Sequence, residues 1–273
     1  MKRAVRSTIV AGLAVAGALL TGPTAAGAAT APAPTVGYDV SHPQCGSVLP
    51  TGQAFGIVGV NGGTAAKVNP CLATELRWAA GSSGAVPAQP KVQLYVNTAN
   101  PGQVIDQVTT WPTTGANRYG ACTGSNSAAC SYQYGQQRAA NDVQAYFAPA
   151  ARAAGISSGP AGYTWWLDVE TGNTWQTGSR AALARNRATL EGMADYFTSV
   201  GARVGLYSTA RQWSRIVGTV PATSTLRPLS SWLAGASTLN GARLNCSWTP
   251  LTGGPVLLAQ FVSGGLDGDV SCR

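Results

Sequence analysis

Short apolar runs recur along this sequence at the spacing of strands that alternate with helices. Each run is rich in Val, Ile, Leu or aromatic residues and is bounded by glycine, proline or polar residues. Runs of this kind are typical of strands that are buried on both faces. The pattern predicts seven strands, at residues 36–40, 55–60, 92–96, 163–169, 203–207, 231–234 and 256–261.

Helical periodicity fills several of the segments between these runs. Residues 133–154 carry apolar positions three and four apart and end at Gly155. Residues 179–200 begin at a serine N-cap and end at Gly201. Shorter helices are expected at 72–80, 103–110 and 210–217.

Alternating strands and helices indicate a parallel sheet with helices outside it. Seven predicted strands, with a candidate eighth at 244–248, fit an α/β fold of the TIM-like (β/α) barrel type better than an open doubly wound sheet. No glycine-rich nucleotide loop follows the first strand, which removes the main reason to expect a dinucleotide-binding sheet. In such a barrel, the active site is built at the carboxyl ends of the strands.

The start of the chain has the organisation of a cleaved export signal. Three basic residues precede an apolar run at 9–20 that is too short to span a bilayer, and small residues follow up to Ala28. No cysteine lies near the cleavage position, so a lipid anchor is not expected. Because the apolar run is too short to span a bilayer, a stable membrane anchor is not expected either. The expected organisation is a signal peptide at 1–28, a short flexible lead-in at 29–35 and one barrel domain at 36–273.

Charge is scarce and mildly positive in the expected mature chain. The signal segment holds three of the 18 basic residues and none of the ten acidic ones, so the remaining net charge is 15 − 10 = +5. The arginines are scattered, which is not the footprint of a nucleic-acid-binding protein. A small positive excess favours attraction to anionic cell-wall polymers. We therefore expect a secreted protein that can associate with the cell wall.

Six cysteines in an exported chain indicate three disulfides, for which the sequence alone allows many pairings. A metal site is not expected, since the chain has no CxxC pair and His42 is its one histidine. The spacing favours the pairs that each close a loop between neighbouring elements, namely Cys45–Cys71, Cys122–Cys130 and Cys246–Cys272.

Half of the ten acidic residues fall at the ends of predicted strands. They are Asp39 after the first strand, Asp168 and Glu170 after the fourth, and Asp267 and Asp269 beyond a Gly-Gly turn after the last. The others fall on predicted helices and are expected to be surface charges: Glu75, Asp106, Asp142, Glu191 and Asp195.

Asp168 and Glu170 form the most specific of these signals. Residues two apart on a strand share a face, so both carboxylates are expected to project into the barrel mouth. Like charges and burial beside Trp165 or Trp166 raise the pKa of one carboxyl group, which gives one acid and one carboxylate at neutral pH. Glycoside hydrolysis needs that combination. Taken alone, the motif is equally compatible with carboxylates that cap helices or bind loop backbone.

Aromatic residues and the single histidine add candidates for the same site. Most of the eight tryptophans are expected in the core, but Trp175 lies in the loop beyond the acid pair, where its ring could pack against a sugar. His42 has no serine or cysteine nucleophile marked for it, and no G-x-S-x-G motif is present. We expect His42 to orient Asp39 or to line the pocket.

The order of these segments resembles that of the glycoside hydrolase family 25 muramidases, cell-wall lysozymes with a TIM-like barrel that cleave the β-1,4 bond between N-acetylmuramic acid and N-acetylglucosamine. The resemblance runs through the whole mature chain in short segments: 37–42 (GYDVSH), 55–63, 167–170 (LDVE), 204–208 (VGLYS) with Trp213, 259–261 (AQF) and 266–270 (LDGDV).

The resemblance implies roles for the candidate residues. Glu170 would be the general acid, and Asp168 would act as nucleophile or would stabilise the reacting N-acetyl group or the oxocarbenium ion. Asp39 and one of Asp267 or Asp269 would complete the acidic mouth. No cofactor is implied, because carboxylate-driven hydrolysis needs none. Substrate-binding side chains are expected at Tyr95, Asn97, Trp166, Trp175, Tyr207, Gln260 and His42.

The sequence departs from the family pattern on the segments that would face the substrate. Asn61 stands where the family usually carries an acidic residue, and residues 94–97 replace an aromatic pair of the Tyr-His type. Residues 271–272 stand where a further aspartate is common, and an inserted loop surrounds the Cys122–Cys130 pair. These departures concern specificity and activity more than the fold.

Two functions of different classes follow from this pattern. One is an exported glycoside hydrolase of peptidoglycan or a related wall glycan, and the other is a barrel that binds wall glycan without cleaving it. A barrel that acts on another glycan, or has a non-glycan function, is a third. For the first two the partner is cell-wall polysaccharide rather than nucleic acid or membrane, and we expect a monomer. Loss of activity but not of binding in Glu170→Gln would distinguish them.

Overall fold

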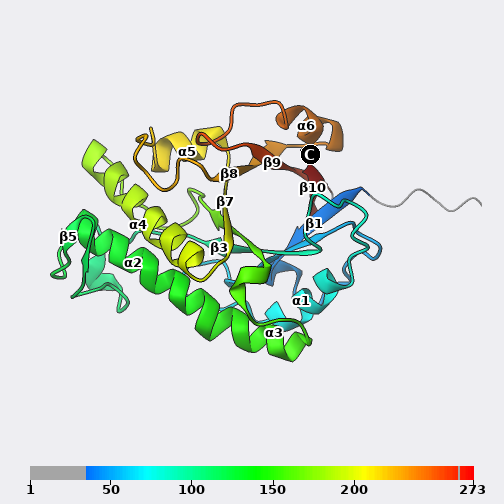
Figure 1. The fold of residues 1–273 in the computed structure, drawn as a ribbon, viewed down its shortest axis with the longest axis horizontal. Helices are drawn as coiled ribbons and strands as arrows, with labels where there is room; N and C mark the ends of the chain where they lie inside the picture. The colour runs from blue at the N-terminus through cyan, green and yellow to red at the C-terminus, as the bar shows by residue number, and fades with distance from the viewer. Residues whose placement is uncertain (1–34, 264) are drawn as a thin grey trace, which may run out of the picture. The chain divides into compact units, whose positions relative to one another are not determined.

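The computed structural model describes residues 35–263 and 265–273, in which eight strands close into one barrel (Figure 1). Around the barrel the strand order is β1-β10-β9-β8-β7-β6-β3-β2. All seven predicted strands and the predicted α/β barrel are confirmed. The strands are β1 (Val36–Val40), β2 (Gly56–Gly59), β3 (Val92–Asn97), β6 (Thr164–Asp168), β7 (Arg203–Ser208), β8 (Ser230–Ala236), β9 (Val256–Ser263) and β10 (Leu266–Ser271).

The strand that completes the barrel is β10, and the expected eighth strand is wrong. Residues Leu239–Asn245 form helix α6, whose N-cap Thr238 accepts a hydrogen bond from the backbone N–H of Gly241. Strand β10 instead runs antiparallel to both β9 and β1, while the other neighbouring strands are parallel. Asp267 and Asp269 therefore lie on a barrel strand rather than in a loop.

The helices on the outside of the barrel agree with the predicted periodicity, with one exception. Predicted helices are confirmed at α1 (Leu72–Ala80), α4 (Arg180–Ser199) and α5 (Ala210–Ile216). The long predicted helix at 133–154 is α2 (Ala128–Asn141) joined to α3 (Ala148–Ala154) through a π-helical segment, Asp142–Phe147. The helix expected at 103–110 is wrong, since only a 3-10 turn forms there, at Ile105–Gln107.

Helices α2 and α4 lie side by side, as Figure 1 shows, because two glycines let their backbones approach. A Cβ atom added to Gly135 of α2 would lie 2.0 Å from the carbonyl oxygen of Thr189. A Cβ atom on Gly192 of α4 would lie 2.1 Å from the carbonyl oxygen of Tyr132. Real side chains cannot approach so closely, so this helix pair depends on glycine at both positions.

Strand β6 shows how the pleat divides the core. Trp165 points outward and stacks on Phe197 of α4, with ring centroids 4.6 Å apart. Trp166 points into the barrel and meets Trp232 of β8 edge to face at 5.8 Å. Since alternate residues share a face, Asp168 lies on the inward face above Trp166. Strand β6 thus places the carboxyl group of Asp168 inside the barrel.

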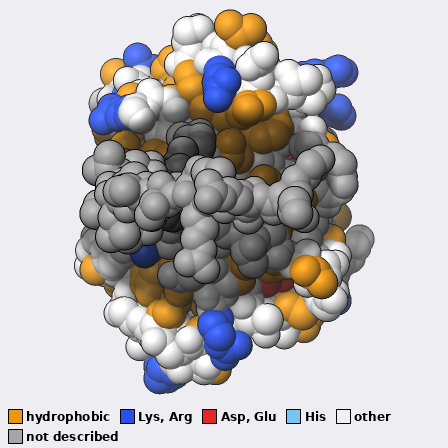
Figure 2. All heavy atoms as spheres, turned by 90° about the vertical axis from the view of Figure 1, so that its right-hand side faces the viewer, with side chains coloured by type: hydrophobic (Ala, Val, Ile, Leu, Met, Phe, Trp, Pro, Cys, Tyr) orange, Lys and Arg blue, Asp and Glu red, His pale blue; other side chains and the backbone are white. Residues whose placement is uncertain are grey.

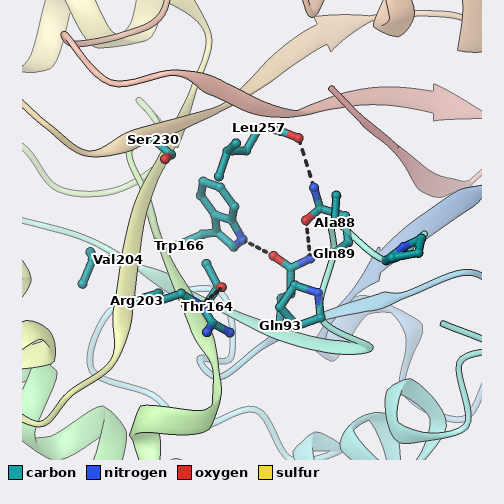
Figure 3. A pocket seen from close by; sticks show the side chains of 11 residues that line it. Ala88, Gln89, Gln93, Thr164, Trp166, Arg203, Val204, Ser230 and Leu257 are labelled. Carbon is teal, nitrogen blue, oxygen red and sulfur yellow. Dashed lines mark hydrogen bonds between the residues drawn. The ribbon is translucent and has the colours of Figure 1, made fainter. Parts of the chain in front are cut away.

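The amino-terminal end of the barrel is closed by a chain of buried hydrogen bonds beneath a pocket of about 630 Å³. Trp166 Nε1 donates to Gln93 Oε1 at 2.9 Å, and Gln93 Nε2 donates to Gln89 Oε1 at 3.1 Å. Gln89 Nε2 donates in turn to the carbonyl oxygen of Leu257 at 3.3 Å (Figure 3). Polar groups at the bottom of the barrel are therefore satisfied by one another.

The three predicted disulfides are confirmed, and no cysteine is left free among the residues described. Cys45–Cys71 joins the turn after β1 to the start of α1, and Cys246–Cys272 joins the end of α6 to the end of β10. Cys122–Cys130 joins α2 to the hairpin of β4 (Ala116–Asn117) and β5 (Gly120–Ala121). Each covalent link restricts the unfolded chain and stabilises the fold.

Three acids that the sequence assigns to the surface are buried in the structure. Glu75, Asp142 and Glu191 are only 2%, 1% and 4% exposed. Each has hydrogen-bond donors that compensate for burial: Asn69 for Glu75, Asn61 for Asp142, and the hydroxyls of Tyr119 and Ser224 for Glu191. Helical periodicity does not reveal such partners, because they come from distant segments. Asp106 is exposed as expected, and Asp195 is partly exposed beside Arg118.

The predicted signal peptide, residues 1–28, and all but Thr35 of the predicted lead-in lie outside the described residues. Within the part of the chain that is described, no helix combines the length and the apolar character needed to cross a membrane. On the face in Figure 2, the Lys and Arg side chains lie at separate places on the described surface, in agreement with the scattered arginines of the sequence.

Candidate active site

The site at the carboxyl end of the barrel is assembled by strand register. Asp39 of β1 lies opposite Asp267 of β10, and Asp168 of β6 lies between Asn97 of β3 and Tyr207 of β7. Because β10 is antiparallel, its first residues lie at the same end as the last residues of the parallel strands. The register thus gathers acids that are up to 228 positions apart in the sequence (267 − 39).

These side chains surround a cavity of about 110 Å³, and none of the described residues that line it is basic. The structure therefore brings four of the five candidate acids into one cavity, together with three of the predicted substrate-binding residues. Its lining residues are Asp39, Tyr95, Asp168, Glu170, Tyr207, Trp232, Gln260 and Asp267.

Of the two acids at the end of β6, Asp168 is the more deeply buried. Its side chain is 3% exposed, and its Oδ2 accepts a hydrogen bond from Asn97 Nδ2 at 2.6 Å. Its Oδ1 is buried without a hydrogen-bond partner among the described residues. Burial raises the pKa of Asp168 well above its ordinary value, and the charge of Glu170 raises it further. The bond from Asn97 acts in the opposite direction, since it favours the carboxylate.

Glu170 lies just beyond β6 and is more accessible than Asp168. Gln212 of α5 holds it, donating from Nε2 to Glu170 Oε1 at 3.3 Å. Trp175 Nε1 donates to the carbonyl oxygen of Glu170 at 2.9 Å. The two carboxyl groups predicted to act together therefore have different surroundings, one buried and one at the opening.

A second group of acids is held by a separate series of hydrogen bonds. Tyr207 Oη donates to Gln260 Oε1 at 2.7 Å, and Gln260 Nε2 donates to Asp39 Oδ2 at 3.0 Å. The neighbouring acid Asp269 accepts from Trp232 Nε1 at 2.8 Å through its Oδ1, and its Oδ2 is buried without a hydrogen-bond partner among the described residues.

Burial raises the pKa of both neighbouring acids in this second group. Burial raises the pKa of Asp269 well above its ordinary value, and the charge of Asp39 raises it further. Burial also raises the pKa of Asp39, to about 7, while the hydrogen bond from Gln260 lowers it. Asp269 is fully buried and therefore supports Asp39 from within the barrel wall rather than lining the cavity. Asp267 does line the cavity, and partial burial raises its pKa.

The remaining predicted substrate-binding residues do not line the acidic cavity. Asn97 lies behind Asp168 and donates to it. Trp166 lies inside the barrel and contributes to the pocket at the opposite end (Figure 3). Trp175 packs in the core outside the barrel and supports the loop that carries Glu170. His42 lies in a short 3-10 turn, where its ring faces Gly63.

Trp232 is a site residue that the sequence does not single out. Its indole ring lies 4.4 Å from the ring of Tyr207 and 6.4 Å from that of Tyr95, measured between centroids. The available signal is the alternation on β8, which places residue 232 on the inward face once the strand is known. Gln212 has no such signal, because it reaches the site from a helix.

One cluster has the spacing of a metal site but not its chemistry. Ligand atoms of Cys45, Cys71 and Glu75 lie within 4.8 Å of one another. Both sulfurs belong to a disulfide, so neither can act as a thiolate ligand.

No known family model and no curated protein matches this chain. Among solved structures, the chain is similar to a muramidase from Trichobolus zukalii, at 18% identity and a TM-score of 0.46, covering 87% of this chain and 93% of that one. It is also similar to the bacterial lysozyme from Streptomyces coelicolor, at 17% identity and a TM-score of 0.46, covering 88% of this chain and 93% of that one. Similarity of this degree carries no argument about activity.

Proposed function

We propose that this protein is an exported glycoside hydrolase that cleaves a cell-wall glycan, with the N-acetylmuramyl β-1,4 bond of peptidoglycan as its target. The observation that carries the proposal is the cavity at the carboxyl end of the barrel. There a buried acid with a raised pKa, Asp168, lies beside a more accessible acid, Glu170. Two acids with such different surroundings can divide the roles of proton donor and charge stabiliser.

In the proposed reaction, Glu170 protonates the glycosidic oxygen and Asp168 stabilises the reacting sugar. In the free protein, burial and the charge of Glu170 raise the pKa of Asp168. Asp168 Oδ1 is buried and has no hydrogen-bond partner among the described residues, so the N–H of an acetamido group would bind it only by displacing what covers the atom. A donor there would favour the Asp168 carboxylate, which is the form that stabilises positive charge on the reacting sugar.

The other residues of the cavity would hold the substrate. Asp39 and Asp267 offer acceptors to sugar hydroxyls, and Gln260 with Tyr207 fixes the orientation of Asp39. The partly exposed rings of Tyr95 and Tyr207 offer apolar surface to the C–H groups of a sugar, and the buried ring of Trp232 supports them. The acidic lining without a basic side chain suits a neutral glycan segment at the reacting bond better than a phosphate-bearing one.

The size of the cavity supports a second candidate function. Pockets that enclose a ligand are typically about 300–1,000 Å³, so a cavity of about 110 Å³ holds a sugar substituent rather than a whole ring. A barrel that binds wall glycan across this opening without cleaving it would need no more room. The same experiment distinguishes the two functions.

Secretion belongs to the proposal as well. Three disulfides in one chain are typical of proteins that work in an oxidising compartment. Together with the signal peptide expected at residues 1–28, they support secretion of residues 29–273. Association with the cell wall as a monomer without a cofactor remains part of the proposal.

The experiment is release of reducing ends from purified peptidoglycan by residues 29–273 and by the Glu170→Gln variant. The hydrolase predicts release that falls by roughly 10²-fold or more in the variant, since a positioned general acid contributes about 10²–10⁴-fold. Glu191→Gln is the matched control, because Glu191 is a buried acid of α4 outside the cavity, and it should retain activity. No release by any of the three proteins, with co-sedimentation on the glycan, would favour the binding barrel.

A further inference from the structure

A buried acid outside the barrel is joined to the acidic cavity by consecutive hydrogen bonds. Asp142 begins the π-helical segment between α2 and α3, and its Oδ1 accepts from Asn61 Nδ2 at 2.9 Å. Asn61 Oδ1 accepts from the backbone N–H of Asn97 at 2.8 Å. Asn97 Nδ2 then donates to Asp168 Oδ2 at 2.6 Å. Asn61 beyond β2 and Asn97 at the end of β3 thus connect Asp142 to Asp168.

The first two bonds of this series determine how the amide of Asn61 is turned. An asparagine side chain offers an acceptor on one side and donors on the other. The backbone N–H of Asn97 can only donate, so Asn61 must direct its oxygen to Asn97 and its NH2 group to Asp142. Asn61 is fully buried, and Asp142 is the one hydrogen-bond acceptor for that NH2 group among the described residues. Without it, a buried donor is left unpaired, and the amide has a reason to turn.

We propose that Asp142 is a positioning residue of the acidic site, which holds Asn61 and thereby the backbone of Asn97, whose side chain donates to Asp168. Its effect on catalysis rests on the proposed function, whereas its effect on Asp168 can be measured in the free protein. Asp142 touches neither the cavity nor a substrate, and it acts only through the two asparagines.

The consequence lies in the ionisation of Asp168. A hydrogen bond that Asn97 donates to the carboxylate lowers the pKa of Asp168, so loss of that bond raises it. The charged groups that face Asp168 are Glu170 and Asp39, and neither belongs to the series. Asp142 itself faces Arg138 and Tyr134 on its own helix, and burial raises its pKa to about 8.

Glu75 is the matched control that distinguishes the proposed positioning role of Asp142 from a purely structural one. Glu75 is a buried acid on α1 whose Oε2 accepts from Asn69 Nδ2 at 2.6 Å. The same Asn69 amide group donates to the carbonyl oxygen of Gly59 on β2 at 2.8 Å. Both acids therefore tie a helix to the end of β2 through an asparagine, but only the series from Asp142 continues to Asp168.

The experiment measures the apparent pKa of Asp168 by carbon NMR in protein labelled at the aspartate carboxyl groups, with the resonance assigned by its loss in Asp168→Asn. Asp142→Leu keeps the size of the side chain and removes the acceptor, so it should raise the pKa of Asp168 by about one unit. Asp142→Asn keeps an oxygen acceptor and should restore a value near that of the unmodified protein. Glu75→Leu should leave the pKa of Asp168 unchanged.

Near-ultraviolet circular dichroism establishes that each variant is folded, and Asn61→Ala interrupts the same series if Asp142→Leu does not fold. An unchanged Asp168 titration in a folded Asp142→Leu or Asn61→Ala variant would overturn the proposal. So would an equal shift in Glu75→Leu, because the effect would then be a general loosening of β2. Failure of the unmodified protein to hydrolyse peptidoglycan would reject the proposed function and leave this titration result standing.

Discussion

At the residue scale, the site depends on side chains that hold acids rather than on the acids alone. Asn97 donates to Asp168, Gln260 to Asp39 and Trp232 to Asp269. Asp168 and Asp269 are buried and Asp39 is partly buried, and burial makes an ionised carboxylate without a donor costly. The donors act against burial, since each of these hydrogen bonds favours the carboxylate and lowers the pKa of its acid.

Trp232→Phe tests this dependence at a single hydrogen bond. The ring is retained and the N–H that donates to Asp269 Oδ1 is lost, so a buried acceptor is left without its partner. We expect the free energy of unfolding to fall by about 1–3 kcal/mol, measured by urea denaturation. Trp248→Phe, at a half-exposed indole, is the control and should change stability by less than about 0.5 kcal/mol. Equal effects in the two variants would contradict the assigned role.

Sequence reasoning at this scale found the acids but not their partners. Asp39, Asp168 and Glu170 could be predicted because they follow apolar runs, and in a barrel such positions meet at one end. Trp232, Gln212 and Asn61 could not, because their roles depend on which strands and helices become neighbours. For the same reason, Asp142 reads as a surface charge on a helical pattern although it is buried against Asn61.

At the element scale, the barrel strands with mostly apolar runs could be predicted from the sequence. The barrel strand β10, in which polar and apolar residues alternate, could not. In β10 the inward residues are Asp267, Asp269 and Ser271, so its buried face is polar and reads as a loop. Its strand pairing arises from β1 and β9, which lie far from each other in the sequence. The helix expected at 103–110 does not form, and the segment contains a single 3-10 turn at Ile105–Gln107.

The pairing of α2 and α4 gives a prediction at this scale. Gly135→Ala would favour the helix by about 1 kcal/mol through propensity alone. The added Cβ would, however, lie 2.0 Å from the carbonyl oxygen of Thr189 and force the helices apart. We expect a net loss of about 1–3 kcal/mol in the free energy of unfolding. Gly172→Ala, where a Cβ meets nothing within 4 Å, should be neutral, and a stabilised Gly135→Ala variant would contradict the close packing.

At the scale of the whole molecule, the protein combines few charges with an unusual share of buried acids. Burial raises the pKa of Asp39 and Glu75 to about 7 and of Asp142 to about 8, and it raises those of Asp168 and Asp269 well above their ordinary value. The folded state therefore binds protons that the unfolded chain has already released above about pH 4–5.

This linkage predicts that the protein is most stable in mild acid. The stabilising contribution of each raised group is fully present below the pKa of the unfolded chain and is lost as pH rises through the pKa of the folded state. The free energy of unfolding should thus fall as pH increases from about 5 to 8, measured by urea denaturation. Glu75→Gln should flatten the part of this slope that ends near pH 7. Stability that rises over this interval would contradict the burial of protonated acids.

If the acidic cavity cleaves the N-acetylmuramyl bond, each cleavage leaves N-acetylmuramic acid at the newly formed reducing end. Identifying the sugar at that end is therefore the decisive measurement. Peptidoglycan treated with residues 29–273 is reduced with borohydride and hydrolysed, and the reduced amino sugars are identified by mass spectrometry. The account predicts reduced muramic acid, formed by the unmodified protein and not by Glu170→Gln. Reduced glucosamine alone, or no reduced sugar above the untreated glycan, would contradict it.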